Sequence, residues 1–224
     1  MSDVEITVRG SSHVFHPAER ATVHAQLGLE GPDADRVYAA VVEQAGRLHT
    51  SVTALHDPAH GPVTWWSAQD VRTWAERPWN TEGKQLPIVH HARAELHVKF
   101  RDFARLGRWL SEAATVPGFG VDRVEWALTA ARKQELEHRA RSAAVEEARA
   151  KAGAYAAALG LDGVRAVALA DAGMLGDGLR PVDDGGAPFA RAMAAPAADD
   201  MLQLVPQDIE ITAQVDARFV AVRP

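Results

Sequence analysis

The chain contains no cysteine. This absence excludes disulfide bonds, cysteine-based zinc sites and catalysis by a thiol. Long apolar runs are missing as well: no stretch approaches the roughly 18 residues that a membrane-spanning helix needs, so we expect no membrane span. Residues 1–9 have neither the basic nor the apolar segment of a signal peptide. We therefore expect a cytoplasmic protein, or an exported one if a leader has been removed.

Positive charge is scarce and scattered. The 24 lysines and arginines are outnumbered by 30 acidic residues, which gives a net charge of −6. Nucleic-acid binding needs clustered basic side chains to neutralise phosphates, so we exclude nucleic acid as a main partner. A Gly-x-Ser-x-Gly nucleophile elbow and the standard glycine-rich phosphate loops are also absent. We predict no catalytic residues, no cofactor-binding residues, and no enzymatic activity.

Alternating polar and apolar residues predict half-buried strands. The clearest is 208–222, where Ile209, Ile211, Ala213, Val215, Ala217 and Phe219 share one face. Strict period two indicates an antiparallel strand with one face in water. Similar patterns predict strands at 4–8, 21–30, 63–76, 92–100, 121–130 and 164–170, whereas 10–17 is interpreted as a turn-rich lead.

Three segments have helical signals. Gly31-Pro32 with Asp33 and Asp35 is typical of a helix start, and apolar residues then recur at helical spacing until Asp57. A shorter helix begins at Asp102 and ends at Pro117-Gly118. An alanine-rich helix covers 132–159 and carries a stripe of small residues, which we expect to lie on its own sheet.

The order of these elements predicts an α+β fold: an antiparallel sheet with helices packed on one face. From the second strand onward the order is βαββαβ, which indicates a ferredoxin-like portion. A long C-terminal helix and terminal strands follow it.

Three blocks together resemble the SIMPL domain family of bacterial and animal proteins. They are the strand 21–30 with the helix start 31–35, the block 144–161 with the strand 164–170, and the segment 206–215. The resemblance covers roughly 4–222, so we expect a single domain over 1–224. It implies an α+β fold, a tendency to form large homo-oligomers, and links to stress protection and to signalling scaffolds. It implies no agreed catalytic residues, and many bacterial members are exported.

The chain has ten histidines, which suggests that some of them could bind a metal ion. His56 and His60 have the i, i+4 spacing that places two ligands together on a helix. Pro58 and Gly61 would break a helix there, however, so the two side chains would not lie together on one helix face. We therefore interpret His56 and His60 as surface histidines. The acidic pairs Asp183-Asp184 and Asp199-Asp200 do not match the spacing of a calcium-binding loop. We predict no metal site.

Four tryptophans, Trp65, Trp66, Trp74 and Trp79, lie within fifteen residues. Tryptophan is enriched where proteins bind one another, so an oligomer interface is one interpretation; packing in the core and stacking against a ligand are the others. Trp65 and Trp66 are predicted to face opposite sides of a strand, so at least one should lie off the main core.

Residues 173–205 are rich in glycine, proline and alanine and have no periodicity. A structureless segment of this length is uncommon in a compact domain, and we expect it to be flexible or held by a neighbouring subunit.

The sequence therefore predicts a non-enzymatic, self-assembling protein with a scaffold or stress-protective role. The alternative is a small-molecule binding protein that uses the tryptophan-rich region 65–79, and an enzyme without a recognisable motif is a third class. A homo-oligomer is expected, and a further protein partner stays open.

Overall fold

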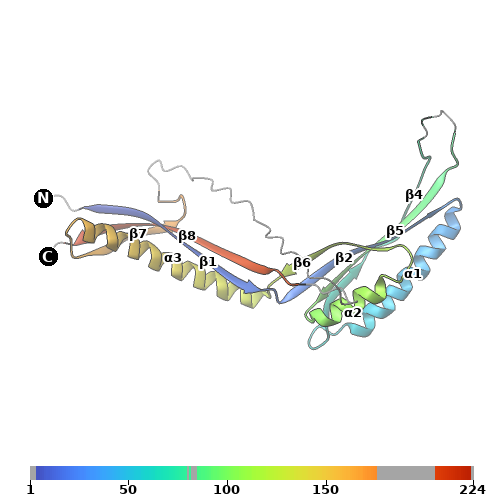
Figure 1. Cartoon of the computed structure of the whole chain (residues 1–224), viewed down its shortest axis with the longest axis horizontal. Coiled ribbons are helices and arrows are strands. Elements are labelled where there is room, and N and C mark those ends of the chain that lie inside the picture. The colour runs from blue at the N-terminus through green and yellow to red at the C-terminus, as the bar shows by residue number, and fades with distance from the viewer. Residues whose placement is uncertain (1–3, 80, 82–84, 176–204, 223–224) are drawn as a thin grey trace, which may run out of the picture. The chain divides into compact units, whose positions relative to one another are not determined.

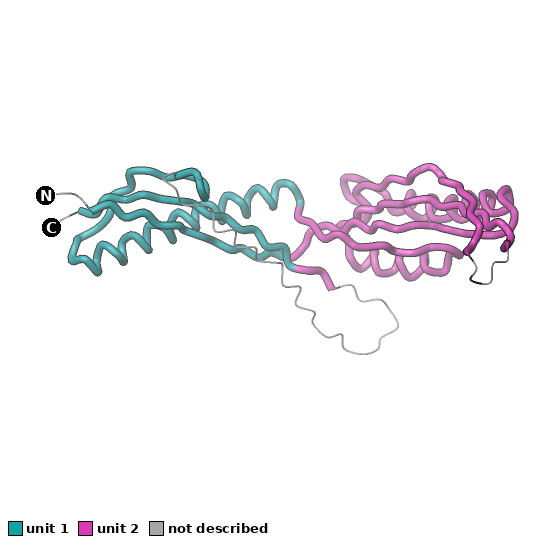
Figure 2. The backbone as a smooth tube through the Cα atoms, turned by 90° about the horizontal axis from the view of Figure 1, so that it is seen from above, with its two compact units in different colours: residues 1–16, 129–196, 208–224 teal, residues 17–128, 197–207 magenta. Residues whose placement is uncertain are grey.

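A computed structural model describes residues 4–79, 81, 85–175 and 205–222. The chain divides into two compact units (Figure 2). Unit 1 comprises the described residues within 1–16, 129–196 and 208–224, and unit 2 those within 17–128 and 197–207. In sequence, the main part of unit 2 therefore lies between the first strand and the long helix of unit 1.

Unit 2 is a five-stranded antiparallel sheet with two helices (Figure 1). Its elements are β2 (Arg20–Gly31), α1 (Ala34–Leu55), β3 (Val63–Ala68), β4 (Arg72–Glu76), β5 (Val89–Phe100), α2 (Phe103–Ala113) and β6 (Phe119–Ala127). The strand order is β3-β5-β2-β6, and β4 also pairs with β5. With β3 and β4 taken as one interrupted strand, the element sequence is βαββαβ, and together with the strand order it confirms the predicted ferredoxin-like portion.

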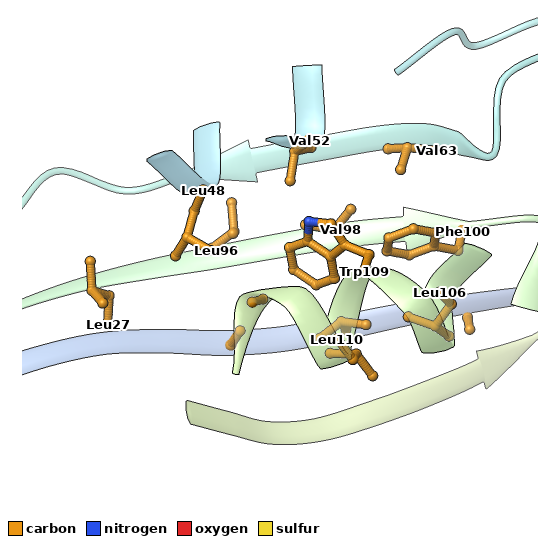
Figure 3. Close-up of a cluster of buried hydrophobic side chains, with 14 of the residues drawn as sticks. Leu27, Leu48, Val52, Val63, Leu96, Val98, Phe100, Leu106, Trp109 and Leu110 are labelled. Atoms are coloured by element: carbon orange, nitrogen blue, oxygen red, sulfur yellow. The ribbon is translucent and has the colours of Figure 1, made fainter. Parts of the chain in front are cut away.

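Both helices of unit 2 cover the same face of the sheet. Each begins where an aspartate, Asp33 or Asp102, accepts a hydrogen bond from the third backbone N–H of the helix. The core beneath them centres on Trp109, whose ring lies 5.5 Å from that of Phe100 (Figure 3). Its indole N–H donates to the Ser51 hydroxyl at 3.0 Å, so the one polar atom of this buried ring has a partner.

Unit 1 is a three-stranded sheet in the order β1-β8-β7 with one helix. The elements are β1 (Glu5–Pro17), α3 (Ala130–Ala158), β7 (Gly163–Asp171) and β8 (Asp208–Val222). A buried stripe at intervals of four residues runs along α3 and consists of Leu136, Ala140, Ala144, Ala148, Ala152 and Ala156. The last four pack on the apolar face of β8, which confirms that α3 lies on its own sheet.

The wet face of β8 carries one buried charge. The Asp216 carboxylate accepts hydrogen bonds from Arg9 Nε at 2.7 Å, from Arg9 Nη2 at 3.1 Å and from the Gly173 N–H at 2.6 Å. The Arg9 guanidinium first, and then the Gly173 N–H, hold the pKa of Asp216 below its usual value. This contact joins β1, β8 and the end of β7.

Two strand predictions were wrong in detail. Residues 10–17 are not a turn-rich lead, because β1 continues to Pro17 and pairs with β8. The small residue Gly10 permits a close approach to α3, since a side-chain carbon there would meet Ala144 and Ala148. The predicted strand 63–76 is two strands, β3 and β4, which a break at 69–71 separates. Of the segment 173–205, residues 176–204 lie outside the described residues, so its predicted flexibility stays a prediction.

Candidate functional site

The face of the unit 2 sheet that the helices do not cover is polar, and we call it the open face. On the central strand β5 it carries His91, Arg93, Glu95, His97 and Lys99, which alternate with the buried side chains of Ala92, Leu96, Val98 and Phe100. Side chains from β2, β4 and β6 lie beside them in antiparallel register. Any binding site on this face is therefore built across several strands.

A β-bulge shapes one edge of the open face. Ala68 pairs with Leu96 and Arg72 pairs with Arg93, so the edge strand has one residue more than β5 between these two pairs. Within the bulge, the backbone N–H of Gln69 still donates a hydrogen bond to the backbone carbonyl of Glu95 at 2.9 Å. Bulges bend a strand locally and redirect its side chains. Here the bulge places Asp70 and Arg72 next to the central strand.

A cavity of about 260 Å³ lies at this bulge and is lined by Gln69, Asp70, Arg72, Trp74, Arg93 and Glu95. A neighbouring hollow of about 410 Å³ shares Gln69, Asp70 and Arg72 with it. Four of the six lining residues carry charge, and one supplies a large apolar surface. Small-molecule sites combine apolar walls with a few converging polar groups, and this cavity is more polar than most of them.

The charged groups of the cavity have no partners in the part of the chain that the structure describes. Arg72 and Arg93 stand directly opposite each other on adjacent strands, and neither forms an ion pair or a side-chain hydrogen bond with a described residue. The Nε atom of Arg93 is moreover buried without a hydrogen-bond partner. Like charges at opposed positions destabilise a sheet, so this pair is an unfavourable arrangement as it stands.

The neighbourhood of Arg93 is also open on its other side. Its partner on β2 is Gly28, which has no side chain, and a side-chain carbon built there would meet nothing closer than 4.0 Å. The β2 position directly opposite Arg93 therefore contributes no side chain to this neighbourhood.

The indole of Trp74 is held in place from the sheet side. It stacks on the imidazole of His91, with ring centroids 5.0 Å apart and planes only 5° from parallel. The His91 ring is 14% exposed and lies between two carboxylates, with Nδ1 3.4 Å from Glu30 and Nε2 3.5 Å from Glu76. Trp74 is 45% exposed and so presents apolar surface on the open face.

The other tryptophans of the region 65–79 lie in different surroundings. Trp65 is on the open face, where the ammonium of Lys99 lies 5.6 Å from its ring centroid. Trp66 packs against the core of unit 2 and lies 4.8 Å from the His49 ring. These positions confirm that Trp65 and Trp66 face opposite ways. Trp79 is 86% exposed.

The histidines that suggested a metal do not converge. His56 ends α1, and the His60 ring is 90% exposed and 4.0 Å from Asp57. His24 and His97 lie together on the open face, with ring centroids 4.6 Å apart. Within 4–79, 81, 85–175 and 205–222, no three His, Asp or Glu side chains are grouped closely enough to hold a metal ion.

Another cavity, of about 700 Å³, lies beside the turn between α1 and β3. The terminal nitrogens of its Arg101 are engaged by the adjoining turn, whereas the Nε of Arg101 is buried without a partner among the described residues. Arg101 donates to the carbonyls of Ala59 and Pro58 at 2.6 and 3.0 Å. Asp57 accepts from the N–H groups of His60 and Ala59, which hold its pKa below the usual value. These contacts stabilise the turn. The smaller cavity beside Trp74 is the better candidate site because it brings four charged side chains together with a stacked indole.

Sequence reasoning found Trp74 but missed its neighbours in the cavity. Arg93 and Glu95 were recognised only as polar positions of a strand, and Asp70 and Arg72 were not singled out. The nearest signal was the interruption of alternation at 69–71, which is typical of a bulge.

None of the described helices is both long enough and apolar enough to cross a membrane. A family model described as SIMPL, protein of unknown function (DUF541), matches residues 6–219 and so extends over both units. No curated protein matches the chain.

Proposed function

The chain belongs to the SIMPL family, and on that premise we propose that it is a non-enzymatic protein which assembles with copies of itself and has a scaffold or stress-protective role. The observation that carries this proposal is the edge of the unit 1 sheet formed by β7. In the described residues, β7 pairs with β8 alone, so its other edge presents backbone N–H and C=O groups to a further strand.

The side chains of β7 make this edge attractive to another chain. Val167 is 43% exposed and Leu169 is 56% exposed. A bulge between Ala166 and Ala168 and the charge of Arg165 limit edge pairing, but they leave both apolar side chains accessible. The terminal strand β8, by contrast, lies between β1 and β7. It therefore has no free edge.

Light scattering coupled to size exclusion at micromolar concentration tests this proposal. We expect a dimer or larger assembly, and Val167→Lys should dissociate it because a charge at the edge opposes strand pairing. Val42→Lys is the matched control, since Val42 is 44% exposed and lies on the helix α1 of unit 2. A wild-type monomer, or equal dissociation by both variants, would count against assembly through β7.

The cavity beside Trp74 supports a second candidate function, the binding of a small molecule. A ligand that binds only the folded protein raises its apparent stability. Thermal shift against a compound library should therefore reveal stabilising compounds whose effect disappears in Trp74→Ala. If all stabilising compounds act equally on the variant, the region 65–79 is not their site.

A further inference from the structure

We propose that the cavity beside Trp74 binds a small zwitterion with an apolar group, of the class of an aromatic α-amino acid. The carboxylate of this ligand contacts Arg72 and Arg93, and its ammonium contacts Asp70 and Glu95. Its apolar group lies against Trp74. The inference rests on the second of the two proposed functions, small-molecule binding, and specifies the ligand.

The arginine pair favours a ligand that carries an oxyanion. Two opposed guanidinium groups repel each other, and a carboxylate between them converts that repulsion into two attractive contacts. The buried Nε of Arg93 has no partner among the described residues, and an arginine donates through Nε and a terminal nitrogen to both oxygens of a carboxylate. Gly28 places no side chain opposite Arg93 on β2.

The two carboxylates of the cavity favour a ligand that also carries a cationic group. Asp70 and Glu95 line the same cavity as the arginines, yet no ion pair joins them to Arg72, Arg93 or any other described residue. The cavity lining has two positive and two negative side chains, so its formal charge is balanced. A simple anion would satisfy the arginines and leave both acids unpaired, whereas a zwitterion satisfies both pairs.

Size and wall chemistry define the rest of the ligand. About 260 Å³ is slightly below the 300–1,000 Å³ or so of pockets for drug-sized molecules, so the ligand is small. Among the described residues, Trp74 is the aromatic residue that lines the cavity, and it stacks on the His91 ring. Contact between a ligand ring and this supported indole favours an aromatic side chain.

Three matched probes separate the parts of this proposal: phenylalanine, 3-phenylpropionate, which lacks the ammonium, and phenethylamine, which lacks the carboxylate. Binding is followed by NMR at the indole N–H resonances of the six tryptophans, with that of Trp74 assigned through Trp74→Phe. We expect phenylalanine to shift the Trp74 resonance with a Kd on the order of 1 mM. Each truncated probe should bind about 10-fold or more weakly, because charged hydrogen-bond partners are left unmade.

Two variants assign the charges to their partners. Arg93→Gln should remove the preference for phenylalanine over phenethylamine, and Glu95→Gln should remove the preference over 3-phenylpropionate. Arg139→Gln is the matched control, since this exposed residue lies on α3 in unit 1. It should leave all three affinities unchanged, and circular dichroism establishes that each variant is folded.

Equal binding of the three probes, or an unchanged preference in Arg93→Gln, would overturn the proposed zwitterion. So would the absence of any shift at Trp74 with all three. In either case, a library compound whose effect is lost in Trp74→Ala would show that the cavity still binds small molecules of another class. The failure of the ligand class is thereby distinguished from the failure of the binding function.

Discussion

Replacing Gly10 by alanine tests how β1 is held against α3. A methyl group at this position would meet the carbonyl oxygen of Ala144, and it would lie 2.8 Å from both the backbone nitrogen and the Cβ of Ala148. Most of these atoms belong to helix backbone, which cannot rotate away as a flexible side chain does. The strand and the helix must therefore separate to admit the methyl group.

Overpacking of this kind usually destabilises a protein by about 1–3 kcal/mol. We expect a value near the upper end, about 3 kcal/mol, because the obstacle is backbone and because Ala144 and Ala148 are fully buried. For a chain of this length, each kcal/mol lowers the midpoint of thermal unfolding by about 2–4 °C. Gly10→Ala should therefore unfold about 6–12 °C below the wild type.

Gly153→Ala provides the matched control in the same unit. Gly153 lies within α3, and a methyl group added there would meet nothing within 4 Å. Alanine is favoured over glycine inside a helix by about 0.5–1 kcal/mol, so this variant should be slightly more stable than the wild type. Circular dichroism at a fixed protein concentration measures both. A Gly10→Ala variant as stable as the wild type would refute the close approach of β1 to α3.

Three further predictions concern individual contacts. Asp216→Asn should lower the free energy of unfolding by about 1.5–3 kcal/mol at neutral pH. Arg9 lowers the pKa of Asp216 in the folded state. The stability that Asp216 contributes is therefore complete above the ordinary aspartate pKa of about 3.9, and it is lost as the pH falls through the folded-state pKa. The unfolding free energies of the wild type and the variant, measured by urea denaturation, should therefore converge in acid. Trp109→Ala should cost about 3–5 kcal/mol, measured by urea denaturation, and a loss below 1 kcal/mol or so would contradict its central place in the core. Gly118→Ala should cost about 1–3 kcal/mol, seen as a lower thermal midpoint, because Gly118 has a φ of +80° and its added carbon would meet the Gly28 carbonyl.

Strong periodic patterns explain why most of the fold could be predicted. β8 occupies 208–222, the predicted range, because its alternation continues without a break along one half-buried strand. The helix starts near Asp33 and Asp102 were recognised because an acidic residue directly before an apolar-periodic segment is a local signal of a helix start. Local signals of this kind do not require knowledge of the partner element.

The errors occurred where a distant partner decides the structure. Gly10, Ser11 and Ser12 have the composition of a turn, yet they form a strand because α3 and β8 hold them there. The candidate site has the same origin. Arg72 and Arg93 become neighbours only through the register that the bulge at 69–71 sets, and no pattern within either strand reveals that register.

The pairing of β1 with β8 has a consequence for how the protein is made. Arg9 and Asp216 are 207 positions apart in the sequence. Since ribosomes add about 5–20 residues per second, roughly 10–40 s pass between the synthesis of these two partners. The strands and helices of unit 2 all lie between Arg20 and Ala127, so this unit can fold during that time.

Throughout this interval β1 carries Ile6 and Val8, apolar residues of the later unit 1 core, without the strand that will cover its edge. Unpaired strands of this kind are sites of misassembly between nascent chains. The period of greatest vulnerability therefore lies during translation, after the five-stranded sheet has formed and before β8 has emerged.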